Sequence, residues 1–210
     1  MTTTARLGRP TAGASPFVLL DDARAENAAC ARLFRDPIEI LCAREVREVA
    51  ALLDGLEAAR ARGLHAAGYL AYEGGKALAP ASRHRSALPM DFDAPLGWFG
   101  LFERVERINA DAVASLLPDP DAAWIGAPRP RVARADYEAA VARVLDYIRA
   151  GDIYQANLTF RADVPFAGDP LAVYARLRQT ARAGYGGFIW TGEQALASLS
   201  GALDRTVETL

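Results

Sequence analysis

Short apolar runs and helical stripes follow one another along this chain in no regular order, and this irregularity constrains the fold most. Runs suited to buried strands lie at 17–20, 37–41, 64–72, 95–109, 188–191, 195–199 and 206–210. Apolar residues at helical spacing lie at 44–62, 111–117, 136–150 and 170–177. A strict alternation of strand and helix, which builds a parallel sheet, is not evident. We therefore expect an α+β fold with antiparallel strand pairing and helices outside a sheet-rich core.

Glycine and capping residues set the expected ends of these elements. Gly63 and Gly151 follow helical stripes at the place of a left-handed C-terminal cap. Asp136 is expected to cap the helix that ends at Gly151, and Asp169 to cap the next one, with proline at its first position. Gly68 lies inside an apolar run, which indicates a close approach of two backbones.

Composition excludes several classes of function. The 210 residues are 51% hydrophobic with a formal net charge of −2, so no basic surface for nucleic acid is expected. No apolar run approaches the roughly 20 residues of a membrane helix, and no signal peptide is visible. The cysteines, at 30 and 42, and the histidines, at 65 and 84, lack metal-ligand spacing, so no metal site is expected. We expect a reduced, cytoplasmic protein with a disordered lead-in at 1–15 and one domain at 16–210.

The stretch from 149 to 159 carries the most informative polar residues. After Gly151, the chain from Asp152 to Val164 alternates in character, which predicts a strand with one polar face. Gln155 and Asn157 share that face, and a buried amide needs a hydrogen-bond partner. These amides could orient a polar ligand or clamp neighbouring backbone, and the residues alone favour the clamp.

The same stretch resembles a known family. IRAGDIYQANLTFR at 148–161, followed by VPFAGDPLAVYARLR at 164–178, is similar to component I of aminodeoxychorismate synthases, relatives of anthranilate synthase component I among the chorismate-binding enzymes. The motif residues are Gly151, Asp152, Tyr154, Gln155 and Asn157. FVLLDD, DPIEIL and GYLAYEGGKAL upstream extend the resemblance to roughly 16–200. The anthranilate branch is the alternative, although it usually carries a Phe-Gln-Val type sequence at this place.

The resemblance implies a fold and a reaction. The fold is an antiparallel β-sandwich flanked by helices, here a truncated form of the anthranilate synthase component I fold. The reaction replaces the 4-hydroxyl of chorismate by an amine, giving 4-amino-4-deoxychorismate for para-aminobenzoate and folate. It uses Mg2+, ammonia from a glutamine amidotransferase subunit, and a nucleophilic lysine in a Lys-Gly-Thr motif.

The sequence departs from this pattern near its end. Ser200-Gly201-Ala202-Leu203 replaces the usual Ser-Pro-Glu-Leu-Phe, and no Lys-Gly-Thr motif follows. Lys76, the single lysine, lies in a glycine-rich loop and cannot replace the missing nucleophile. We therefore expect an N-terminal portion that is inactive alone, has no catalytic residue and binds no Mg2+.

A second site is implied by the amino-acid pocket that family members carry. Leu20 and Asp21 match its first wall, and Tyr185 lies where a proline-rich turn is expected, but within Gly184-Tyr185-Gly186. The alternatives are a plain strand end, a non-catalytic module that binds an amino acid or docks the glutaminase, and a fragment that misfolds.

Overall fold

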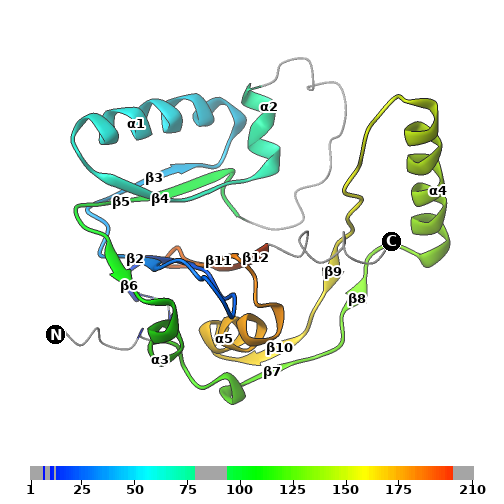
Figure 1. Ribbon diagram of the computed structural model, residues 1–210. Helices are drawn as coiled ribbons and strands as arrows, with labels where there is room; N and C mark the ends of the chain where they lie inside the picture. Colours follow the sequence, from blue (N-terminus) through cyan, green and yellow to red (C-terminus); the bar gives the residue numbers. More distant parts are fainter. Residues whose placement is uncertain (1–6, 8–9, 12, 79–93, 201–210) are drawn as a thin grey trace. The chain divides into compact units, whose positions relative to one another are not determined.

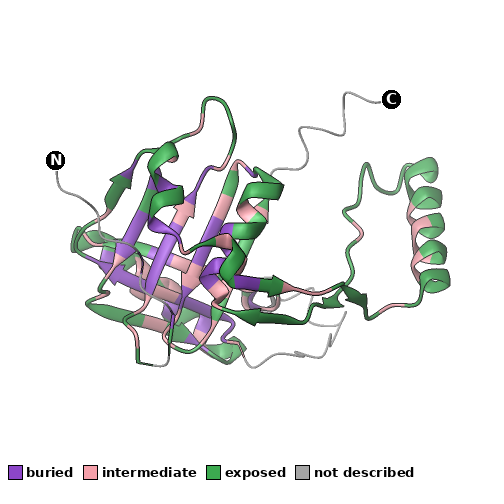
Figure 2. Ribbon diagram, turned by 90° about the horizontal axis from the view of Figure 1, so that it is seen from below, coloured by how far each residue is buried: buried purple, intermediate pink, exposed green. Residues whose placement is uncertain are grey.

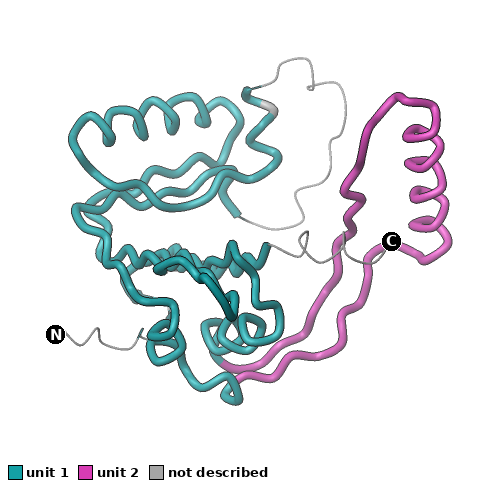
Figure 3. The backbone as a smooth tube through the Cα atoms, viewed as in Figure 1, with its two compact units in different colours: residues 1–122, 169–210 teal, residues 123–168 magenta. Residues whose placement is uncertain are grey.

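The computed structural model describes residues 7, 10–11, 13–78 and 94–200, apart from the side chain of Lys76. The chain forms two compact units, one from residues 1–122 and 169–210 and a smaller one from Ala123–Gly168 (Figure 3). Each unit has its own hydrogen-bonded strands.

A five-stranded antiparallel sheet organises the larger unit. Its strands run in the order β12-β11-β1-β2-β6. Their bounds are Ala195–Ser200, Tyr185–Trp190, Phe17–Asp21, Ala31–Arg35 and Glu106–Ile108. The central strand β1 alternates between two apolar faces, because both sides of this sheet are covered.

A second antiparallel sheet has the order β3-β5-β4, with bounds Glu39–Ala43, Gly97–Phe102 and His65–Leu70. Helix α1, Val49–Ala61, packs on its outer face through Val49 and Leu52. Gly68 permits the β4–β5 pairing, since a Cβ at this position would overlap the carbonyl oxygen of Trp98. The close backbone approach expected at Gly68 is therefore confirmed.

The larger unit has four layers (Figure 1). Helices α5 (Pro170–Ala181) and α3 (Val113–Leu116) pack on the outer face of the five-stranded sheet, where Tyr174 and Phe188 are buried. Val18 and Phe34 on its inner face meet Trp98 and Phe102 of the second sheet. Buried residues concentrate in these sheets (Figure 2). The expected α+β sandwich flanked by helices is confirmed.

The smaller unit is built on helix α4, Arg134–Ala150, and the chain that returns from it. Two short ladders join its arms, β7 (Ala123–Ile125) with β10 (Phe166–Gly168) and β8 (Arg129–Pro130) with β9 (Ala162–Asp163). No residue of α4 is buried, but the Tyr137 ring packs on Phe160 and its hydroxyl donates to the Leu158 carbonyl at 3.2 Å.

The remaining elements are short: α2 is Gly75–Leu78, and 3-10 turns span Val46–Glu48, Tyr72–Gly74, Ala110–Ala112 and Pro120–Ala122. No helix in the described part of the chain is long and apolar enough to cross a membrane.

Several local expectations are confirmed. Gly63 and Gly151 have φ of +76° and +79°, as left-handed caps require. The Asp169 carboxylate accepts a hydrogen bond from the Leu171 amide at 2.9 Å, and Pro170 begins the helix. The run at 206–210 and most of the loop expected at 74–93 lie outside the described residues.

Other expectations are wrong. The run 95–109 is not one strand: β5 and β6 are separate and join different sheets, because the chain turns at 103–105. Ala133, not Asp136, is the N-cap of α4. The strand expected at 152–164 is absent except for β9, because no described strand pairs with residues 152–161. Strand β2 was missed, because its two arginines interrupt the apolar run that would have indicated a buried strand.

Candidate functional site

A cavity of about 610 Å3 opens between the two sheets of the larger unit. Strands β1, β2, β11 and β12 supply one wall, and Gly68 and Tyr69 of β4 supply the other. A volume of several hundred cubic ångströms is typical of small-molecule sites. The cavity is therefore the candidate binding site of this unit.

Strand register explains how the sheet wall is hollowed. Leu20 of β1 lies opposite Arg32 of β2 on one side and Gly187 of β11 on the other, and Gly187 in turn lies opposite Ser198 of β12. Residues opposite one another in a sheet share a face. Gly187 presents no side chain in this row, so the wall recedes between Leu20 and Ser198.

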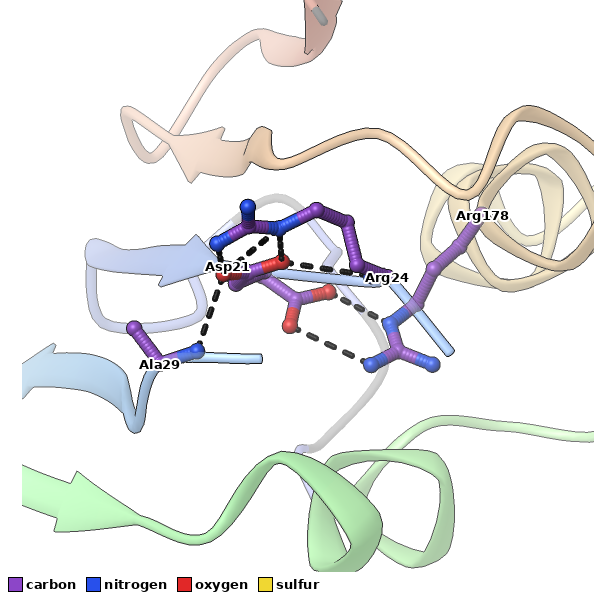
Figure 4. Close-up of polar contacts among 5 residues, drawn as sticks. Asp21, Arg24, Ala29 and Arg178 are labelled. Carbon is purple, nitrogen blue, oxygen red and sulfur yellow. Dashed lines mark hydrogen bonds and ion pairs between the residues drawn. The ribbon is translucent and has the colours of Figure 1, made fainter. Parts of the chain in front are cut away.

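The Asp21 carboxylate turns away from this row, because successive residues of a strand face opposite sides. Its Oδ2 accepts hydrogen bonds from Arg178 Nε at 2.5 Å and from the Tyr174 hydroxyl at 3.1 Å, and its Oδ1 accepts from Arg178 Nη2 at 3.2 Å. Figure 4 shows the paired guanidinium and carboxylate. Burial, and then the Asp21 charge, raise the pKa of Tyr174. Asp21 therefore ties β1 to α5.

Asp22 forms a second saturated cluster at the rim of the cavity. Its carboxylate accepts from Arg24 Nε at 3.0 Å and Nη2 at 2.7 Å, from the Arg24 amide at 3.2 Å and from the Ala29 amide at 2.9 Å. The bonds from Arg24 hold the pKa of Asp22 well below its usual range. This cluster closes the loop that connects β1 to β2.

The two glycines that flank Tyr185 lie where a side chain would contact neighbouring groups. A Cβ at Gly186 would lie 3.0 Å from the Tyr174 hydroxyl, and one at Gly184 would lie 3.2 Å from Arg24 Nε. Tyr185 itself is 80% exposed and borders the cavity. The structure thus brings Leu20, Asp21 and Tyr185 to one cavity, although only Leu20 and Tyr185 lie on its side of the sheet.

Tyr69 is a wall residue that sequence reasoning missed. Its hydroxyl oxygen is buried and has no hydrogen-bond partner within the described part of the chain. Burial raises the pKa of Tyr69. Asp22, Arg24 and Arg32 were also missed; the alternation Ala31, Arg32, Leu33 is the signal that could have placed Arg32 on an exposed strand face.

The motif from Gly151 to Asn157 lies in the smaller unit, beyond the end of α4. The five motif residues are exposed, and Tyr154 is 93% exposed. Gln155 and Asn157 are exposed, and neither side chain hydrogen-bonds to another described residue, so the backbone clamp that the residues alone favoured is not formed in this part of the chain. The described residues therefore contain no clamp built from these amides.

A metal centre is not formed by the residues that the structure describes. No group of three or more histidine, cysteine, aspartate or glutamate side chains among them could hold an ion.

The sequence pattern of chorismate binding enzymes matches residues 15–203. The chain belongs to the chorismate-binding enzyme family. Anthranilate synthase component 1 of Thermus thermophilus is 45% identical over 67 residues, which are 32% of this chain and 14% of that enzyme. The aligned segment thus spans a small part of that relative. Membership of the chorismate-binding family leaves both the aminodeoxychorismate and the anthranilate branch open.

Proposed function

We propose that this chain contributes the N-terminal scaffold of an aminodeoxychorismate synthase component I, which aminates chorismate at position 4. The supporting observation is the family match over 15–203, combined with Tyr154-Gln155-Ala156-Asn157-Leu158 directly after α4. The runner-up is the anthranilate branch, which the similarity to the Thermus thermophilus enzyme favours.

The chemistry of amination calls for groups that these residues do not provide. The sequence holds one lysine, Lys76, and no Lys-Gly-Thr motif. We therefore expect the 210-residue polypeptide to supply framework and a binding cavity, while a further stretch of polypeptide supplies the nucleophile and the Mg2+ ligands. We also propose that a glutamine amidotransferase subunit delivers the ammonia.

Product analysis tests this proposal. The purified chain is incubated with chorismate, Mg2+ and ammonium, alone and with a polypeptide that carries the Lys-Gly-Thr half of a related component I. We expect no product alone and 4-amino-4-deoxychorismate with the complement. Formation of anthranilate instead would favour the anthranilate branch. Turnover by the chain alone would contradict the proposal that a further stretch of polypeptide supplies the nucleophile.

A second candidate function is amino-acid binding without catalysis. It is favoured because Leu20 and Asp21 border one cavity together with Tyr185, which is far from them in the sequence. Titration calorimetry with L-tryptophan tests it directly. Heat of binding that is lost when Leu20→Trp fills the cavity supports the module, and a flat titration with the unaltered chain counts against it.

A further inference from the structure

We propose that this chain forms a symmetric homodimer in which residues 154–160 of two copies pair as antiparallel strands. This self-association goes beyond the function proposed above and does not depend on it. It follows from a segment that has the pattern of a strand but no strand beside it among the described residues.

The segment 154–160 has a main chain that joins no ladder. It runs from the end of α4 towards β9 (Figure 1), and its amides and carbonyls form no bond to the main chain of another described residue. The Leu158 carbonyl accepts a hydrogen bond from the Tyr137 hydroxyl. Leu158 is half-buried and the other six residues of the segment are exposed. Free main-chain groups of this kind form a template on which another strand can pair.

Nothing in the sequence of this segment blocks such pairing. From Ile153 to Phe160 the chain has no charged residue and no proline. Strands at the edge of a sheet usually carry such residues, which discourage pairing with another chain. The edge strand β6 carries Glu106 and Arg107, and the edge strand β3 carries Glu39. The segment 154–160 therefore lacks the protection that these two edges have.

The segment is complementary to itself, which identifies a second copy of this chain as the partner. In an antiparallel pair centred on residue 157, opposed residues match in polarity on both faces. The pairs are Tyr154 with Phe160, Ala156 with Leu158, Gln155 with Thr159, and Asn157 with Asn157 of the other copy. A shift by one residue would place apolar side chains opposite polar ones, so the pattern selects this register. Because the register maps the segment onto itself, a twofold axis relates the two copies.

Helix α4 supports the apolar face of the paired segments. The Tyr137 ring packs edge-on against Phe160, with 5.2 Å between the ring centroids. In a strand, Tyr154 lies on the same face as Phe160. The Tyr154 ring, which is 93% exposed in the single chain, would gain Phe160 of the second copy as an aromatic neighbour. Dimerisation thus removes apolar surface from water as well as pairing the free main-chain groups.

Cysteine cross-linking tests the axis at Asn157. Cys30→Ser and Cys42→Ser first remove the two exposed thiols. In this background Asn157→Cys places two thiols opposite one another, within reach of a disulfide. Thr159→Cys is the matched control: the two thiols would lie four residues apart along the pair, roughly 14 Å at about 3.4 Å per residue. Mild oxidation should convert most of N157C, and less than a tenth as much of T159C, into a disulfide-linked dimer.

Charge exchange at the same position tests the pairing without a covalent bond. Light scattering after gel filtration should give the unaltered chain twice the mass of one chain. Asn157→Asp and Asn157→Lys each place like charges opposite one another and should weaken dimerisation at least threefold. A mixture of the two variants should restore the dimer, whereas Thr159→Asp, which faces Gln155, should change dimerisation less than twofold. Circular dichroism checks that each variant folds.

The inference fails if the unaltered chain has the mass of a single chain. It also fails if N157C and T159C cross-link equally, or if the mixture of N157D and N157K stays monomeric. A chain that is monomeric alone, but binds a Lys-Gly-Thr polypeptide through 154–160, would assign the segment to that partner and refute the second copy. The product assay with chorismate is independent of the mass of the unaltered chain.

Discussion

Replacing Arg178 by methionine tests the energetic role of the buried ion pair between β1 and α5. The Asp21 side chain has 0% and the Arg178 side chain 13% exposed surface, so the pair is shielded from water. Methionine keeps most of the volume and removes the charge. The Asp21 carboxylate then remains buried with one partner, the Tyr174 hydroxyl.

Removing one member of a buried pair typically costs about 3–5 kcal/mol, because the other charge is left uncompensated. For a domain of this size, each kcal/mol lowers the melting temperature by roughly 2–4 °C, so R178M should melt about 6–20 °C lower. The double variant Asp21→Leu/Arg178→Met should recover most of the loss, since no buried charge remains.

Chemical unfolding followed by tryptophan fluorescence measures these differences, because Trp98 and Trp190 are buried in the larger unit. Arg62→Met is the control: Arg62 pairs with Glu39 at 3.1 Å, but the two side chains are 53% and 44% exposed. An exposed pair contributes about 0–1 kcal/mol. If R178M were no less stable than R62M, the argument that Asp21 depends on Arg178 would be refuted.

Three further predictions concern local features. Because the Asp22 pKa is depressed in the folded state, the ionised Asp22 stabilises the fold above the ordinary aspartate pKa of about 3.9, and this stabilisation is lost as the pH falls below that value. Asp22→Asn should therefore flatten the decline in unfolding free energy measured from pH 5.5 to about 2.5. An unchanged slope would contradict this. Asp169→Ala should cost about 1 kcal/mol in urea unfolding, whereas Asp136→Ala, which removes no cap bond, should cost less than half of that; equal losses would refute the cap assignment. Gly68→Ala should lower the melting temperature sharply, because the added Cβ would overlap a main-chain oxygen of β5. The added Cβ of Gly75→Ala has no other atom within 4 Å, so this control variant should melt at the unaltered temperature. A native-like melt of Gly68→Ala would contradict the register of β4 against β5.

Local chemistry made much of the fold predictable. Gly63 and Gly151 end helices because a left-handed residue is needed there, and Asp169-Pro170 begins one because carboxylate and ring satisfy the first turn. Each of these features depends on residues within a few positions. The apolar strands at the start and end of the larger unit were predictable for the same reason.

Features that depend on distant partners were not predictable. Residues 152–161 have the alternation of a strand but no described strand beside them, and alternation alone forms no hydrogen-bonded ladder. The run 95–109 divides between two sheets, because the larger unit stacks one sheet on another. No local signal in the sequence reveals this stacking.

The candidate site shows the same division. The sequence by itself determined the family resemblance and the α+β class, and the resemblance implied that Leu20, Asp21 and Tyr185 belong to one pocket. Only the tertiary structure decided that the Asp21 carboxylate is consumed by Arg178 and Tyr174, residues more than 150 positions away, and that Arg32 lies opposite Leu20 at the cavity. The physical reason is that the charge available to a ligand depends on which ion pairs the folded chain has already formed.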